Sequence, residues 1–384
     1  MPKKNFKERH AWKKITAIVL SVGAVVFFGA LFPTRFGKLP DGWRLERIMA
    51  SPNYVNGEFR NQIPTPMIVQ KQSWISYSWK YVLGHFWKYL LGSKNRLRPP
   101  RALPVVKTDL KSLDIKRNLL VWFGHSSCFL QIGGKRILLD PVFSSYASPF
   151  FFLNRAFEMG YQYTAEDMPE IDYLIISHDH WDHLDFLTVI ALRHKIKAII
   201  CPLGVGEHLE YWGFTPEIIH EADWYEKLCL EPQFTVHVLP SRHFSGRGLI
   251  RNKTLWAGFM LEIGDCRVFY SGDGGYDPRF AEIGEKFGVV NLAIMEAGQY
   301  DQRWKYIHMT PEESVQGAED LRAKAVIPVH AGKFCLCNHV WNDPYRRIVA
   351  ASRGRSFKLL TPVIGEVVDI QDVRQSFHEW WEIE

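Results

Sequence analysis

The residues with the clearest chemical potential lie in one short stretch, residues 177–185, which reads SHDHWDHLD. His178, His180, Asp182 and His183 follow the spacing H-x-H-x-D-H. Imidazole nitrogens and carboxylate oxygens are ligands that zinc-like divalent ions prefer, and the lack of thiolates favours a working site over a structural one. Surface histidines on a loop are the alternative interpretation, but this pattern arises by chance in roughly one chain in a thousand.

The flanking pattern places this stretch in a tight loop between a strand and a helix. Residues 171–176 are apolar and rich in β-branched side chains, as expected of a buried strand, and a helix-like spacing follows the loop. Alternate side chains of an extended segment point the same way, so His178 and His180 can meet on one ion. Asp182 and His183 point elsewhere and can serve a second ion.

This spacing resembles that of the metallo-β-lactamase superfamily, whose members include binuclear hydrolases. The family requires three further ligands downstream, namely a lone His, an acidic residue at a strand end and a final His. The chain offers His243, Asp273 and His330 in that order, and each follows a strand-like apolar run. A lone histidine is a weak signal, but the ordered set behind H-x-H-x-D-H is a strong one.

The resemblance implies two metal positions built from seven side chains. The first ion is held by His178, His180 and His243, the second by Asp182, His183 and His330, and Asp273 bridges both. A water between two cations loses a proton readily, so a bridging hydroxide is the implied nucleophile. We expect two Zn²⁺ ions, with manganese or iron as alternatives. The carboxylate at position 273 resembles the phosphodiesterase, lactonase and thioesterase branches, which makes antibiotic hydrolysis unexpected.

Further motifs resemble the group that contains N-acylphosphatidylethanolamine-hydrolysing phospholipase D. They are WFGHSS at 122–127, LLDPVFS at 138–144 and RWKYIH at 303–308, and the similarity spans about residues 100–370. It implies that His308 contacts or protonates an oxyanion at the substrate phosphate and that Asp140 is needed for activity. Asp140 could accept a hydrogen bond from a ligand histidine. The alternatives are a turn-capping Asp and an exposed loop His.

Four other polar residues lie near these motifs. His125 is a further candidate near the metals, or else a plain histidine at a strand end. Arg247, Arg251 and Asn252 lie in a polar loop just after His243 and could bind a phosphate, although solvation of the loop explains them equally well.

The net charge of +6 hides an uneven distribution. Residues 1–118 hold 22 Lys and Arg against 6 Asp and Glu, whereas residues 119–384 hold 25 against 35. A nuclease would need a basic surface around its active site, so nucleic acid is not an expected partner. The basic lead-in instead favours proximity to anionic lipid headgroups.

An uncharged apolar run at residues 15–32 follows a basic tail at residues 1–14. Eighteen residues is the lower limit for spanning a bilayer. A secretory signal peptide is the alternative, but no convincing small-x-small cleavage site precedes Pro33, so we expect an uncleaved single-pass anchor. The basic excess before the run predicts a cytoplasmic N-terminus and a catalytic domain on the periplasmic or extracellular side.

Residues 33–118 form a basic, aromatic lead-in to the catalytic domain. Within it, residues 73–91 carry aromatic and aliphatic side chains at helical spacing. Two interpretations stay open, a helix lying in the membrane interface and a helix packed on the catalytic domain.

Strand-like apolar runs begin at residue 119, and a catalytic domain covering residues 119–384 is expected there. Two strands joined at Gly133-Gly134 form a hairpin, and strand, ligand loop and helix then repeat through residue 333. The resemblance implies an α+β fold, a four-layer αββα sandwich. The six cysteines form no C-x-x-C pair and are expected to be free, and the oligomeric state stays open.

Three functions are compatible with these features. The leading one is a membrane-anchored binuclear phosphodiesterase that cleaves a phospholipid in the manner of a phospholipase D. The second keeps the fold and the metals but hydrolyses a lactone or another ester. The third is a non-catalytic membrane protein that keeps a metal for stability.

Overall fold

The computed structural model describes residues 33–69, 97–372 and 374–383, together with Ser21 and Gly23. Two predicted segments therefore lie outside the described residues: the helix at residues 73–91 and the apolar run at residues 15–32, apart from Ser21 and Gly23. In the described part of the chain, no helix combines the length and the apolar character that a membrane crossing needs.

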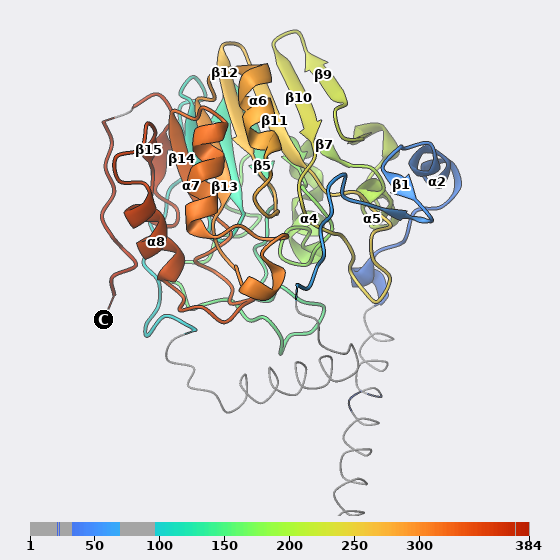
Figure 1. The fold of residues 1–384 in the computed structure, drawn as a ribbon, viewed down its shortest axis with the longest axis horizontal. Helices are drawn as coiled ribbons and strands as arrows, with labels where there is room; N and C mark the ends of the chain where they lie inside the picture. Colours follow the sequence, from blue (N-terminus) through green and yellow to red (C-terminus); the bar gives the residue numbers. More distant parts are fainter. Residues whose placement is uncertain (1–20, 22, 24–32, 70–96, 373, 384) are drawn as a thin grey trace, which may run out of the picture.

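Two seven-stranded sheets form the centre of the molecule (Figure 1). The first has the order β16-β3-β4-β5-β6-β7-β8, in which β3 to β5 are antiparallel and β5 to β8 are parallel. Its strands are β3 (Leu119–Trp122), β4 (Cys128–Ile132), β5 (Lys135–Leu139), β6 (Ile171–Ile175), β7 (Ile196–Pro202), β8 (Ile219–Ala222) and β16 (Val367–Asp369).

The second sheet repeats this plan with the order β15-β14-β13-β12-β11-β10-β9. Strands β9 to β12 are antiparallel, and β12 to β15 are parallel. Its strands are β9 (Lys227–Glu231), β10 (Phe234–Leu239), β11 (Gly258–Ile263), β12 (Cys266–Tyr270), β13 (Leu292–Glu296), β14 (Ala325–Val329) and β15 (Lys358–Leu359).

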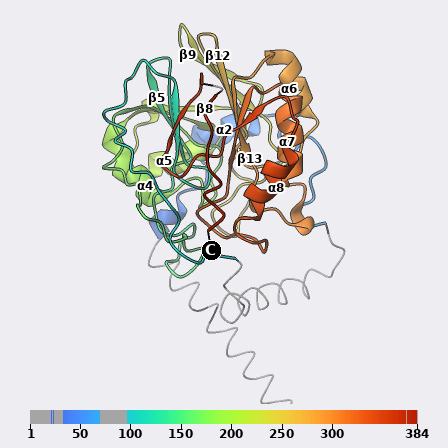
Figure 2. The same cartoon turned by 90° about the vertical axis from the view of Figure 1, so that its left-hand side faces the viewer.

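Helices cover the outer face of each sheet, so that four layers follow one another in the edge-on view (Figure 2). The first sheet carries α4 (Phe186–Leu192) and α5 (Val205–Tyr211), and the second carries α6 (Arg279–Phe287), α7 (Pro311–Asp320) and α8 (Asp343–Ala351). Short 3-10 turns lie between these elements: η2 (Arg193–Lys195), η3 (Pro216–Ile218) and η4 (Gln302–Trp304).

Side-chain alternation along the strands builds a separate core on each side of a sheet. On β12, Val268 and Tyr270 point into the core between the two sheets, while Phe269 points to the core beneath α6 and α7. On β4, Phe129 points the other way from its neighbours, toward α4 and α5. The predicted α+β fold with two sheets is confirmed.

The predicted lead-in contributes structure to this domain. Residues 33–69 form η1 (Pro33–Phe36), α2 (Gly42–Met49) and the hairpin of β1 (Tyr54–Val55) with β2 (Glu58–Phe59). The buried Arg44 guanidinium pairs with three carboxylates of the catalytic domain, those of Glu207, Glu210 and Glu221. The Asn61 amide donates to the His243 carbonyl at 2.8 Å. This segment therefore supports a predicted ligand loop directly.

Strands β3, β5 and β6 share one direction, as do β10, β12, β13 and β14. Their carboxyl ends meet at one edge of the sandwich, which is where polar residues of α/β proteins commonly gather into a site. Every predicted ligand follows the end of one of these strands.

Candidate metal centre

The first predicted metal position is a cluster of three imidazoles. His180 Nδ1 lies 2.9 Å from His178 Nε2 and 3.2 Å from His243 Nε2. Four ligand atoms at about 2.1 Å from one zinc ion lie about 3.4 Å apart, so these separations suit a shared ion. The two residues of the H-x-H pair do converge, as their spacing predicted, and His243 joins them from the loop after β10.

The second predicted position gathers the other half of the motif. Asp182 Oδ2 lies 3.2 Å from His330 Nε2 and 3.6 Å from His183 Nε2. All three side chains are deeply buried. His330 arrives from the loop after β14, almost 150 residues further along the chain. The structure thus gathers Asp182, His183 and His330 into a second group, although the His183 ring also lies 4.2 Å from that of His178.

Asp273 stands between the two positions. Its Oδ2 atom lies 3.1 Å from both His183 Nε2 and His330 Nε2. The same atom is 3.8 Å from His243 Nε2 and 3.9 Å from His178 Nε2. One carboxylate oxygen therefore approaches imidazoles of both clusters, which is the placement required of a bridging ligand.

The polar atoms at this centre fit a pair of cations. His183 Nε2 and Asp273 Oδ1 are buried and have no hydrogen-bond partner, which is costly unless an ion satisfies them. Burial lowers the pKa of His180 to about 4, and burial together with neighbouring imidazoles lowers the pKa of His178 as well. Neutral imidazoles with converging lone pairs are the form that binds a metal.

The second position holds excess negative charge when no ion is bound. Burial opposes protonation of His330, but the carboxylates of Asp273, Asp182 and Glu296 outweigh it and raise the pKa of His330 to about 10. The pKa of His183 is raised in the same way, against its burial, chiefly by Asp273 and Asp182. A divalent cation bound here would balance the same negative charge.

Asp140 makes the contact expected of it. Its Oδ2 atom accepts from His183 Nδ1 at 2.7 Å, and its Oδ1 accepts from the Ser177 backbone N–H at 2.7 Å. The Ser177 hydroxyl lies 2.9 Å from His178 Nδ1 and donates to Asp140 in turn. One fully buried carboxylate therefore orients two ligand imidazoles, directly or through Ser177, which fixes their tautomers.

His125 lies at the metal centre rather than at a plain strand end. Its Nε2 atom is 2.8 Å from Asp182 Oδ2, and burial lowers the pKa of His125 to about 3, so the neutral ring donates this hydrogen bond. His125, Asp140 and His330 have left-handed φ angles of 52°, 37° and 67°. Such backbone is unfavourable for these residues and persists where surrounding contacts enforce it, as at functional sites.

His308 lies at the rim of the centre and is partly open to solvent. Its ring stacks on His330, with centroids 5.2 Å apart, and stands edge-on to His243 at 5.0 Å. It therefore touches one imidazole from each cluster. The half-buried Phe244 ring lies beside His180 and His243, with centroids 4.5 and 4.8 Å away.

Glu296 is a residue of this centre that sequence reasoning missed. It is the last residue of β13, fully buried, and its carboxylate hydrogen-bonds to His308 Nδ1. A signal was present, because Glu296 ends an apolar run just as the predicted ligands follow theirs. It was overlooked because the ligand set of the resembling family has no place for it.

The predicted phosphate-binding loop divides into two kinds of residue. Arg247 is buried, donates to the carbonyls of Asp179 and Leu184, and stacks 3.9 Å from the Trp181 ring, so it holds the metal loop and cannot reach a phosphate. The Asn252 side chain accepts from Ser245 N–H and closes the loop. For Arg247, phosphate binding and loop solvation are therefore both wrong. Arg251 is exposed and lies over Phe244 at the rim.

Comparisons with known proteins place this chain in a family of the same fold. Residues 135–331 match the family model described as β-lactamase superfamily domain. The chain is 36% identical over 340 residues to an uncharacterised protein of Mycobacterium tuberculosis, covering 87% of this chain and 88% of that protein.

Two further similarities bear on activity and on fold. An N-acyl-phosphatidylethanolamine-hydrolysing phospholipase D of Caenorhabditis elegans is 33% identical over 227 residues, which are 56% of this chain and 63% of that enzyme. Among solved structures, a metallo hydrolase of the archaeon Ignicoccus hospitalis superimposes with a TM-score of 0.50 at 21% identity, covering 66% of this chain and 98% of that one. The second similarity concerns the fold alone.

Proposed function

Because this chain belongs to the β-lactamase superfamily and is a metal-dependent hydrolase, we propose that it cleaves a phospholipid of the N-acylphosphatidylethanolamine kind. The similarity to the C. elegans phospholipase D over 227 residues carries this proposal. In a reaction of this type, water adds to phosphorus and the bond to the ethanolamine oxygen breaks. Phosphatidic acid and an N-acylethanolamine leave.

The residues of the chain have separable roles in this reaction. Two divalent ions, when bound, ionise a water and stabilise negative charge on the substrate. The seven ligands proposed to hold them are those named above, with zinc as the default metal. His308 lies beside both clusters at the open rim, where it can donate a proton to an oxygen of the phosphate group. Arg251, exposed on the same rim, supplies positive charge to the phosphate.

The surface beside the metal loop suits a lipid substrate. Three neighbouring segments, residues 33–38, 143–155 and 244–253, contain no Asp or Glu and, apart from the buried Arg247, five Lys and Arg; we call them the basic loop face. Phe36 contacts Trp181 with ring centroids 5.2 Å apart, and Arg247 donates to the Arg35 carbonyl at 2.9 Å. The rest of the catalytic domain is acidic overall, so this face is locally distinct.

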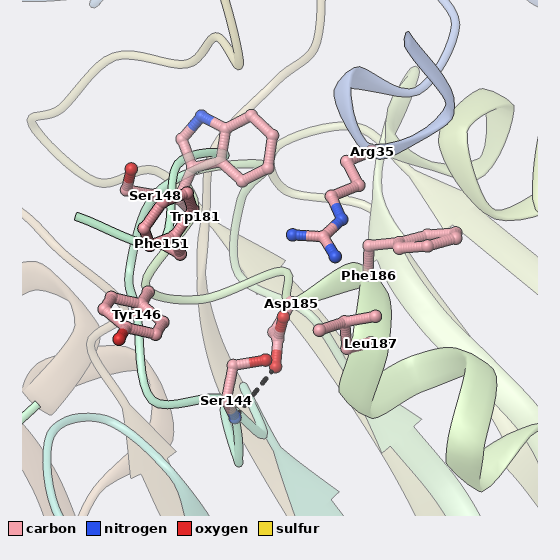
Figure 3. Close-up of a pocket in the computed structure, with 9 residues that line it drawn as sticks. All are labelled: Arg35, Ser144, Tyr146, Ser148, Phe151, Trp181, Asp185, Phe186 and Leu187. Atoms are coloured by element: carbon pink, nitrogen blue, oxygen red, sulfur yellow. Dashed lines mark hydrogen bonds between the residues drawn. The ribbon is translucent and has the colours of Figure 1, made fainter. Parts of the chain in front are cut away.

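Apolar side chains project from the same face. Leu249 is completely exposed, and Ile250 and Phe151 are 54% and 61% exposed. Figure 3 shows the small cleft in which Arg35 points between Trp181 and Phe186, with Phe151 on the opposite wall. Exposed apolar residues among basic ones are typical of surfaces that dock on anionic membranes. The face would bring the metal centre to the bilayer.

We also propose that residues 15–32 anchor the chain and that the catalytic domain lies outside the cytoplasm. The uncharged run and the basic tail before it support this arrangement. Alkaline phosphatase fused to the C-terminus should be active in a bacterial host, since that reporter folds only outside the cytoplasm. An inactive, stably expressed fusion would contradict this orientation.

A substrate panel tests the proposed activity. The purified full chain, loaded with zinc, manganese or iron, is given N-acylphosphatidylethanolamine in mixed micelles, a chromogenic phosphodiester and a set of lactones. We expect metal-dependent release of N-acylethanolamine. Turnover of lactones alone would support the ester-hydrolase alternative, and turnover of neither phosphodiester would remove the phospholipase proposal.

Replacing Leu249 by Glu tests the basic loop face. We expect the variant to hydrolyse the lipid in anionic vesicles about tenfold more slowly, because roughly 1.5 kcal/mol of apolar burial in the bilayer is lost. A water-soluble short-chain analogue should be cleaved at the normal rate. Val289→Glu, an equally drastic change on an exposed side chain before β13, is the matched control. Equal rates for both variants on vesicles would exclude docking through this face.

A further inference from the structure

A buried carboxylate links the open rim of the centre to its metal-binding loops. Glu296 is fully buried at the end of β13, between the loops that carry Asp273 and His308. Its Oε2 atom accepts from the Gly274 backbone N–H at 2.6 Å, directly after the proposed bridging ligand. Its Oε1 atom hydrogen-bonds to His308 Nδ1. Neither the proposed metal ligands nor the proposed proton donor include this residue.

A third group approaches the same oxygen. His330 Nδ1 lies 3.2 Å from Glu296 Oε1, close enough for an ion pair although not in the geometry of a regular hydrogen bond. Most ligand imidazoles of the centre have another acceptor for their second nitrogen. His183 uses Asp140 and His243 uses the Ile307 carbonyl at 2.9 Å. Glu296 is the carboxylate that serves His330.

These contacts require a carboxylate and not an amide. Both oxygens of Glu296 face N–H donors, Gly274 on one side and the two imidazoles on the other. A glutamine presents one oxygen and one NH₂ group, so its NH₂ group meets either the Gly274 N–H or the Nδ1–H of His330, which carries the proton when Nε2 binds the metal. A buried donor left without an acceptor costs about 1–3 kcal/mol. Glu296→Gln is therefore a precise probe that changes one atom and the charge.

The position of His308 depends on this contact. Its ring lies between His243 and His330 at centroid distances of 5.0 and 5.2 Å, and its Nδ1 atom is directed to Glu296. The Nε2 atom, at the other end of the ring, is thereby turned away from Glu296. Without the carboxylate, no hydrogen bond would fix the rotation of this ring about its side-chain bonds.

We propose that Glu296 is a positioning residue that holds His308 in place for the substrate while supporting the metal ligand His330. The part that concerns His308 rests on the proposed function. The part that concerns His330 does not, because metal binding requires no substrate. One carboxylate then couples the geometry of the rim to that of the second metal position.

The experiment compares four variants of the full chain: Glu296→Gln, His308→Gln, the double variant and Glu262→Gln. The last is a matched control, since Glu262 pairs with His237 at 2.8 Å on strands β10 and β11, outside the metal centre. Affinity for the second metal ion is measured by competition with a coloured chelator. Steady-state rates are measured on any phosphodiester or ester that the wild type turns over.

We expect Glu296→Gln to bind the second ion about tenfold more weakly and, at saturating metal, to lower kcat about 30-fold with KM within about twofold, in line with other partners of metal ligands. His308→Gln should keep normal metal affinity. The double variant should be no slower than His308→Gln by more than about threefold, because both changes remove one interaction. Glu262→Gln should behave as wild type.

Two results would overturn the inference. One is normal metal affinity and normal kcat in Glu296→Gln, and the other is a double variant whose loss is the product of the two single losses. If Glu296→Gln does not fold, Glu296→Asp replaces it in the same measurements of metal affinity and kcat. This variant keeps the negative charge but has a shorter side chain, so its carboxylate lies further from His308 and His330. If the wild type turns over no lipid, the phospholipase proposal fails, while the metal affinities still decide the role of Glu296 toward His330.

Discussion

Asp182→Asn is expected to lower kcat/KM about a thousandfold and to reduce the metal content of the chain from two ions to one. Asp182 Oδ2 lies within 3.6 Å of His183 Nε2 and 3.2 Å of His330 Nε2. Removing its charge leaves two imidazoles with Asp273 alone to balance a divalent cation. The loss corresponds to about 4 kcal/mol of transition-state stabilisation, which is the scale of a lost metal contribution. Metal content is measured by elemental analysis of the purified variant.

The matched control is Asp172→Asn. It makes the same substitution at the start of β6, the strand that leads into the metal loop. Asp172 pairs with Lys197 at 2.8 Å and lies on β6, away from the carboxyl edge. It should keep both ions and normal activity. If Asp182→Asn retained two ions and more than a tenth of wild-type activity, Asp182 would not be a metal ligand. That result would favour the third function, a membrane protein that keeps a metal for stability.

The parts of this centre that local sequence could predict are those with a periodic signal. The apolar run before His330 was predicted to be a strand and is β14, because a short apolar run that ends at a polar loop is typical of a buried strand. The convergence of His178 and His180 could be predicted from backbone alternation. His243, Asp273 and His330 required the family resemblance, since nothing local distinguishes a ligand histidine from a structural one.

The parts that were missed depend on contacts between distant segments. Arg247 was interpreted as a phosphate-binding or solvated loop residue, but its guanidinium is enclosed by the Trp181 ring and three backbone carbonyls, which no local pattern predicts. Residues 33–69 show little strand patterning, yet Asn61 supports the His243 loop and the Arg242 guanidinium donates to the Pro64 carbonyl. Glu296 has the right local pattern, but its role is defined by Gly274 and His308, 22 and 12 residues away.

Removing the metal with a chelator is expected to abolish activity and to lower the melting temperature of the chain by roughly 8 °C. Ligand binding at a free concentration a thousandfold above Kd stabilises a fold by about 4 kcal/mol, and each kcal/mol shifts Tm by about 2 °C in a domain of this size. Restoring zinc, manganese or iron separately should recover both properties to different degrees. The ion that restores the highest kcat identifies the working metal.

The difference in melting temperature between the metal-free and the metal-loaded chain should depend on pH. This dependence tests the charge balance at the second metal position. In the metal-free chain, the pKa of His330 is raised to about 10, so its proton contributes stability that is complete below pH 6.5 and is lost as the pH rises toward 10. Metal binding must displace that proton, so affinity increases with pH. The melting temperatures of the metal-free and metal-loaded chains should therefore diverge between pH 6.5 and 10. Parallel curves would mean that His330 is not protonated without metal, and that Asp273, Asp182 and Glu296 do not act on it together.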